Sequence, residues 1–101
     1  MTSPLQIKVS QDAQAQIEEA AAWWAQNRPF APGAVRQDLD RILVLLSVNP
    51  GIGARARRAK LGGVRRVTLS RVRYYVYYRV SGNVLEVLAF WHTSRGRQPQ
   101  L

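Results

Sequence analysis

The chain contains no cysteine and only one histidine, His92, among its 101 residues. Disulfides and thiolate metal sites are therefore excluded, and a single imidazole cannot build a histidine-based metal cluster. No apolar run reaches the roughly 20 residues that a membrane-spanning helix needs, and the N-terminus lacks a basic segment leading into an apolar one. We expect a cytoplasmic protein with one domain over residues 1–101, no metal, no cofactor and no membrane contact.

Acidic residues are also scarce, and their distribution divides the chain in two. Residues 1–40 carry five acids against three cationic side chains, whereas residues 41–101 carry eleven arginines and Lys60 against one acid, Glu86. The second part therefore attracts polyanions or an acidic protein partner. A basic surface kept only for solubility is the alternative. Thirteen arginines and only two lysines favour recognition, because arginine stacks on bases and pairs bidentately with phosphate or carboxylate.

Residues 64–92 combine β-branched and aromatic side chains with interspersed arginines, a pattern typical of two or three consecutive strands. A turn at Ser81-Gly82-Asn83 makes the last two a hairpin. Strand alternation predicts one mainly apolar face, comprising Tyr74, Val76, Tyr78 and Val80. It predicts an opposite cationic and aromatic face, comprising Arg73, Tyr75, Tyr77 and Arg79. In the returning strand, the same rule groups His92 with Glu86, Leu88 and Phe90.

The first half of the chain predicts one strand and two helices. Leu5, Ile7 and Val9 alternate with polar residues, as in a half-buried strand. Ser10 is a good N-cap for a helix from about Gln11 to Asn27, whose apolar stripe comprises Ala13, Ile17, Ala20, Ala21 and Trp24. After two prolines, a second helix is expected from about Ala34 to Val48, and its inner stripe comprises Val35, Leu39, Ile42, Leu43 and Leu46. The first stripe is expected to face the sheet.

Three apolar side chains fall outside these stripes. Trp23 precedes the last residue of the first stripe and lies about 100° away from it, so it either packs at the flank or stays partly open for a partner. Val44 and Val48 project roughly opposite the second stripe, and a helix that is apolar on both sides is either covered twice or meets a partner. Residues 52–63 predict an exposed basic loop, either solvated or in contact with a target. Residues 93–101 predict a polar tail.

Two motifs carry a resemblance to a known family. They are Val64-Arg65-Arg66-Val67-Thr68-Leu69 leading into Tyr75-Val76-Tyr77-Tyr78-Arg79-Val80, and Val84-Leu85-Glu86-Val87-Leu88-Ala89-Phe90-Trp91-His92-Thr93-Ser94-Arg95. With the order strand, helix, helix, three strands and the Pro50-x-x-Gly53 break after the second helix, the chain resembles the RelE/ParE superfamily of bacterial type II toxins over nearly its whole length. The resemblance implies an α+β fold, in which two helices cover one face of an antiparallel sheet and the other face is open and basic.

The superfamily divides by activity, and Tyr75 bears on the division. RelE-like members cleave mRNA on the ribosome, whereas ParE-like members poison DNA gyrase by binding it. RelE-like nucleases resemble one another in carrying a catalytic arginine three residues before the Tyr-Arg-Val triplet. Here the triplet is Tyr78-Arg79-Val80, so this position is Tyr75. The resemblance therefore implies a ParE-like toxin that is not an enzyme, although Arg73 on the same predicted strand face is a possible substitute.

His92 is the strongest nuclease-like feature that remains, because an imidazole exchanges protons near neutral pH. In a nuclease it would act with Arg73, Arg79 or Arg65 at the phosphate. The alternative role for His92 is structural, as a hydrogen-bonded anchor of the strand end or the tail.

We therefore expect the toxin of a type II toxin–antitoxin system that inhibits DNA gyrase, with ribosome-dependent mRNA cleavage as the alternative. A ParD-like antitoxin with an acidic segment is the expected partner. DNA contact is expected only through the antitoxin, and a DNA-binding module is disfavoured because no recognition helix is evident. The predicted target-binding residues are Arg65, Arg66, Arg73, Arg79, Arg95 and Arg97. The predicted antitoxin-binding residues are Trp23, Val44 and Val48.

Overall fold

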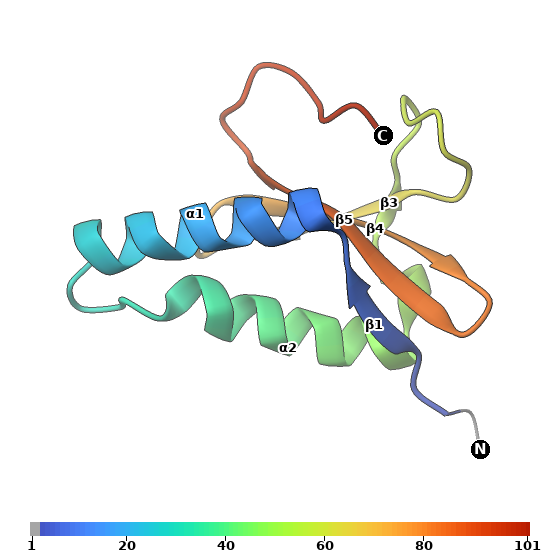
Figure 1. Cartoon of the computed structure of the whole chain (residues 1–101), viewed down its shortest axis with the longest axis horizontal. Coiled ribbons are helices and arrows are strands. Elements are labelled where there is room, and N and C mark those ends of the chain that lie inside the picture. Colours follow the sequence, from blue (N-terminus) through green and yellow to red (C-terminus); the bar gives the residue numbers. More distant parts are fainter. Residues whose placement is uncertain (1–2) are drawn as a thin grey trace.

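The computed structural model describes residues 3–101, in which two helices lie together on one side of a sheet (Figure 1). In chain order the elements are β1 (Gln6–Val9), α1 (Gln11–Asn27), α2 (Ala34–Val48), the 3-10 turn η1 (Pro50–Ile52), β2 (Ala54–Arg55), β3 (Arg65–Leu69), β4 (Tyr74–Ser81) and β5 (Val84–His92). The predicted α+β fold is confirmed, and both helices have the predicted bounds. Two short elements, η1 and the two-residue β2, were not predicted from the sequence.

The sheet has five strands in the order β1-β5-β4-β3-β2. The four strands from β2 to β5 are antiparallel neighbours, whereas β1 lies at the edge, parallel to β5, with Gln6 opposite Val84. The resemblance implied an antiparallel sheet. The observed sheet is antiparallel from β2 to β5 but mixed as a whole, because β1 is parallel to β5. Parallel strands need a long crossover connection, and the chain that runs through both helices supplies it.

The start of α1 is tied to the sheet by Ser10, the predicted N-cap. Its Oγ accepts a hydrogen bond from the amide of Ala13 at 3.1 Å, and it donates to the carbonyl of Leu88 in β5 at 3.2 Å. The cap satisfies one of the free amides at the helix start. Its second bond fixes where the helix begins relative to β5.

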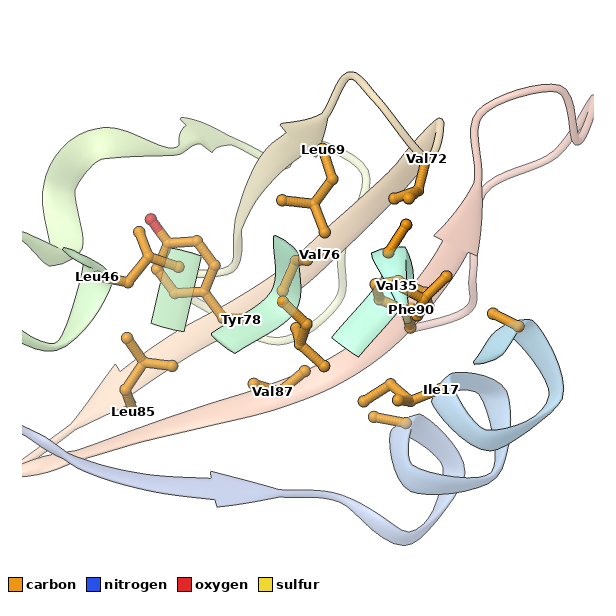
Figure 2. Packing of buried hydrophobic residues seen from close by; sticks show 14 residues of the cluster. Ile17, Val35, Leu46, Leu69, Val72, Val76, Tyr78, Leu85, Val87 and Phe90 are labelled. Carbon is orange, nitrogen blue, oxygen red and sulfur yellow. The ribbon is translucent and has the colours of Figure 1, made fainter. Parts of the chain in front are cut away.

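The main core lies between the helices and the sheet (Figure 2). Both predicted stripes face this core: Ile17 of α1 and Val35 and Leu46 of α2 are buried, and the remaining stripe residues are buried or half-buried. The sheet contributes Val76, Tyr78, Leu85, Val87 and Phe90 to the same cluster. The periodicity of the two helices therefore predicted correctly which of their sides is covered.

Tyr78 fastens the segment after α2 to the sheet. Its hydroxyl donates to the carbonyl of Pro50 at 2.6 Å and accepts from the amide of Gly53 at 2.9 Å. A Cβ on Gly53 would stand 2.6 Å from that hydroxyl, so the close approach requires glycine. Burial raises the pKa of Tyr78, although its hydrogen bond with Gly53 and the nearby charge of Arg65 lower it in part.

One ion pair bridges α2 and the turn between β3 and β4. Arg71 donates to both carboxylate oxygens of Asp38, from Nε at 3.0 Å and from Nη2 at 2.6 Å. This hydrogen bonding raises the pKa of Arg71. The bidentate geometry gives the pair orientation as well as charge complementarity.

Candidate functional site

A β-bulge divides the side chains of β5 between the two faces of the sheet. Tyr77 lies opposite Ala89, but the next residue, Tyr78, lies opposite Val87, so Leu88 is the extra residue of the bulge. Side chains beyond a bulge change sides relative to simple alternation. Leu85, Val87 and Phe90 consequently pack in the main core, whereas Leu88, Ala89 and Trp91 join a separate cluster on the opposite face.

We call the face of the sheet that points away from the helices the second face. Its buried cluster comprises Val64, Tyr77, Leu88, Ala89 and Trp91. Only 2% of Tyr77 and 8% of Trp91 is exposed. The expectation of an open face is therefore wrong, because part of the chain covers this cluster.

The cover comes from the loop before β3 and the segment after β5, which lie close together in Figure 1. Ala56 and Ala59 of the loop and Leu101 pack against the second-face cluster. The amides of Lys60 and Leu61 donate to the carbonyl oxygen of Leu101 at 2.5 and 3.3 Å. The predicted exposed loop and polar tail are thus anchored, although the charged side chains of the loop remain exposed.

Four of the six predicted target-binding arginines lie on or beside the second face. Arg66 places its guanidinium 4.2 Å from the ring centroid of Tyr75, and Arg95 lies 3.9 Å from that of Trp91. The carbonyl of Arg97 accepts a hydrogen bond from the Trp91 indole at 2.8 Å. At this edge the guanidinium groups of Arg66 and Arg95 lie against aromatic rings, and we call Arg66, Arg79, Arg95 and Arg97 together the arginine edge.

Arg79, also on this face, is opposite Glu86 in the β4–β5 ladder. Its Nε is buried and has no hydrogen-bond partner among residues 3–101. An unpaired buried donor costs roughly 1–3 kcal/mol. Among the four arginines on or beside the second face, Arg79 is therefore the one whose side chain has a buried donor without an acceptor.

The other two predicted target-binding arginines lie elsewhere. Arg65 shares the helix side with Tyr78 by register, and it donates to the carbonyl of Gly53 at 2.7 Å. Arg73 is not in a strand but in the turn before β4, where its φ is 64°. A non-glycine residue in this left-handed region costs roughly 1–2 kcal/mol. The prediction that Arg73 shares a strand face with Tyr75 is therefore wrong, because Arg73 belongs to the turn and β4 begins only at Tyr74.

Tyr75, at the position where RelE-like nucleases resemble one another in carrying arginine, lies on the second face. Its ring packs edge-on against Tyr77, with centroids 6.2 Å apart, and lies beneath the guanidinium of Arg66. An aromatic ring at this position offers a stacking surface and no phosphate-binding charge.

His92 lies on the helix side of the sheet, opposite Tyr74 and in edge-on contact with its ring at 5.0 Å. The predicted grouping with Phe90 is right, but the grouping with Glu86 and Leu88 is wrong because of the bulge. The His92 Nδ1 accepts from the amide of Ser94 at 3.1 Å and is 2.6 Å from its hydroxyl oxygen. These bonds fit the structural role, an anchor for the chain after β5.

The residues that the nuclease alternative requires, His92 with Arg73, Arg79 or Arg65, are only partly brought together in the structure. Arg73 and His92 line one pocket of about 390 Å³ beside the C-terminal half of α1. Arg65 and Arg79 lie away from it, on the β3 helix side and on the second face. The bulge, which sequence periodicity does not report, is what places His92 and Arg79 on opposite sides of the sheet.

The three predicted antitoxin-binding residues are exposed, but they do not form one patch. Val44 and Val48 near the end of α2 are 71% and 59% exposed, and Leu45 between them adds to this apolar patch. Trp23, 46% exposed, belongs to the C-terminal half of α1. That half of α1 lies beside the start of α2, away from the end of α2 that carries Val44 and Val48 (Figure 1). A partner that contacts all three must run along both helices.

Across residues 3–101, none of the helices combines the length and apolar character that a membrane crossing requires.

Comparison with known proteins agrees with this architecture. The model of a family described as the ParE toxin of the type II toxin–antitoxin system parDE matches residues 7–97. A chain of the chromosomal ParDE toxin–antitoxin system from P. aeruginosa superposes with a TM-score of 0.69 and 21% identity, covering 89% of this chain and 97% of that one. No curated protein sequence gives a significant match.

Proposed function

Because the chain belongs to the ParE toxin family of type II toxin–antitoxin systems, we propose that it inhibits DNA gyrase by binding it and is neutralised by a cognate ParD-like antitoxin in the cytoplasm. The observation that carries this proposal is Tyr75. An aromatic ring under Arg66 occupies the position where the nuclease branch is expected to carry a catalytic arginine. This ring supports a binding role for the second face over phosphate chemistry.

The proposed target surface is the arginine edge of the second face. Arg66 and Arg95 hold their guanidinium groups against the rings of Tyr75 and Trp91, so a partner meets cations on an aromatic base. Arg79 lies on the same face, and the backbone of Arg97 is tied to Trp91. Arginine and aromatic residues of this kind supply much of the energy of protein interfaces. Arg65 and Arg73 lie away from this edge. Their contact with the target remains a prediction from the sequence.

The proposed antitoxin surface runs over the helices. The apolar patch at Val44 and Val48 suits the apolar side of an amphipathic helix, and Trp23 suits a further segment of the same chain. The excess of arginine in residues 41–101 attracts an acidic segment that orders on binding. Loss of apolar contact on α2 should therefore weaken neutralisation without changing the target surface.

A supercoiling assay with purified gyrase tests the proposal. The protein should inhibit supercoiling, and a variant with Arg66→Ala and Arg97→Ala should be about ten-fold weaker, equivalent to about 1.4 kcal/mol. Its matched control, Arg36→Ala with Arg41→Ala on exposed positions of α2, removes the same charge and should inhibit nearly as well. Equal losses would show that net charge, not this edge, determines inhibition.

The alternative activity is tested in the same preparation. Cutting of mRNA on translating ribosomes, with gyrase unaffected, would refute gyrase inhibition. His92→Gln then decides the role of the imidazole. Unchanged toxicity of the folded variant agrees with the hydrogen-bonded anchor, whereas loss of cutting would make His92 catalytic.

A further inference from the structure

A pocket of about 390 Å³ lies between the C-terminal half of α1, the turn before β4 and the end of β5. Its lining residues are Trp23, Trp24, Arg28, Arg71, Val72, Arg73 and His92. The volume falls within the roughly 300–1,000 Å³ typical of small-molecule sites. The pocket is on the helix side of the sheet, away from the proposed gyrase-binding surface. A ligand in this pocket is therefore independent of whether the protein inhibits gyrase.

The positive φ of Arg73 is the first indication of a ligand. Its backbone is fixed on both sides, because its amide donates to the carbonyl of Leu69 at 2.8 Å and its carbonyl accepts from the amide of Thr93 at 2.9 Å. Glycine would suit φ 64° without strain. Strained residues of this kind concentrate at functional sites. The exposed Arg73 guanidinium has no ion-pair partner within residues 3–101, so the strain places a free cation in the pocket.

The second indication is the aromatic wall. The rings of Trp23 and Trp24 meet edge-on at 6.2 Å, which leaves Trp23 almost half exposed. The guanidinium of Arg28 lies 5.0 Å from one ring and 5.5 Å from the other. Arg28 thus lies over both rings, and a flat ligand that stacks on the part of Trp23 left exposed has an arginine beside it. An aromatic ring with a neighbouring arginine is the combination that binds bases with their phosphates in single-stranded nucleic acids.

The charged residues of the pocket determine on which side an anionic group of a ligand would bind. Arg71 is neutralised by Asp38, which leaves Arg28 and Arg73 as the uncompensated cations. The amide of Ser94 donates to Nδ1 of His92, so the neutral ring carries its proton on Nε2 and can donate there. A smaller hollow of about 140 Å³ also includes Trp23 and His92, and it is lined by side chains of opposite charge, Glu19 and Arg95. An anionic group is thus drawn toward Arg28 and Arg73, the side of Trp23 and His92 that carries only cations.

We propose that this pocket binds a nucleoside phosphate, as a free nucleotide or as one unit of a single strand. The base stacks on Trp23, and the phosphate lies between Arg28 and Arg73 with a donor from His92. Arginine binds phosphate bidentately, whereas an exposed indole beside it selects a ligand with a π face. An acidic peptide would use the arginines but not the exposed ring.

Titration of the protein without antitoxin, followed by tryptophan fluorescence, tests the pocket. AMP should quench the emission and bind at least about ten-fold more tightly than adenosine or inorganic phosphate, since only AMP uses both halves of the site. An eight-residue oligoadenylate distinguishes the source: much tighter binding than AMP indicates a strand, and similar binding a free nucleotide. Equal binding of AMP and inorganic phosphate, or of AMP and a glutamate-rich peptide, would overturn the proposal.

Arg73→Gly separates binding from stability. Glycine relieves the strained backbone, so the melting temperature should rise while AMP affinity falls about ten-fold. Arg57→Gly, the same change in the exposed basic loop, is the matched control and should leave AMP affinity within about two-fold. Trp23→Ala should reduce AMP binding to the level of inorganic phosphate. If Arg73→Gly binds AMP like the wild type, or if Arg57→Gly weakens it equally, the pocket is not the site.

Discussion

The two faces of the sheet are buried by different parts of the chain. On the helix side, α1 and α2 bury Val76, Leu85 and Val87 almost completely, with long apolar stripes. On the second face, a loop and the chain after β5 cover Tyr77 and Trp91 through a few small side chains and isolated hydrogen bonds. Stability should therefore reside in the first face, and the arginine edge that we assign to target binding lies on the more thinly covered one.

The largest test of this difference uses two leucines of the same strand. Leu85→Ala opens a cavity beneath the helices and should cost about 2–5 kcal/mol of unfolding free energy. Leu88→Ala, on the second face, should cost distinctly less because its thin cover can collapse onto the space. Urea denaturation of both variants measures the difference. Equal losses would mean that the two covers stabilise the sheet equally.

Tyr78→Phe should come next in size. It removes the hydroxyl that serves both Pro50 and Gly53, leaving the buried Gly53 amide unpaired, at a cost of about 1–3 kcal/mol. Tyr75→Phe on the second face is the matched control and should change stability by less than about 0.5 kcal/mol. A Tyr78→Phe protein as stable as its control would show that the segment after α2 is held by packing alone.

Alkaline pH should weaken the helix side. Burial raises the pKa of both Tyr74 and Tyr78, and nearby Glu19 raises that of Tyr74 further. The stability that the neutral forms of these two tyrosines contribute is fully present below the unfolded tyrosine pKa of about 10. This contribution is lost as pH rises from there through the higher folded pKa values. Denaturation at pH 8.5 and 10.5 measures the loss. Tyr78→Phe should lose less over this interval, and an equal loss would assign it to other groups.

The smallest effect is expected where the chain after β5 is anchored. Trp91→Phe removes the bond to the Arg97 carbonyl and should cost about 0.5–1.5 kcal/mol. Its more specific result should be faster hydrogen exchange at the amides of Lys60 and Leu61, because the cover they hold becomes looser. Trp23→Phe, on the helices, should leave that exchange unchanged. Unaltered exchange in Trp91→Phe would locate the anchor elsewhere.

The sequence predicts the helix side better than the second face. Periodicity and the Ser10 cap identified both helices and their buried sides, because helix formation and capping act over a few residues. The second face was misjudged because its cover depends on Ala56, Ala59 and Leu101, small or isolated side chains without a local pattern. One signal was present: β5 is apolar on both sides, which is typical of a strand covered twice.

Local chemistry along the chain determined the helices, the hairpin with its Gly82 turn, the basic second half and Tyr75 in place of arginine. Tertiary structure alone decided the bulge at Leu88, which assigns His92 to the helix side and Trp91 to the other. It also decided the positive φ of Arg73, which brings that guanidinium beside Trp23 and Arg28. The reason is physical: a bulge and a strained turn are selected by packing between distant segments, and neither leaves a periodic trace in the residues that adopt it.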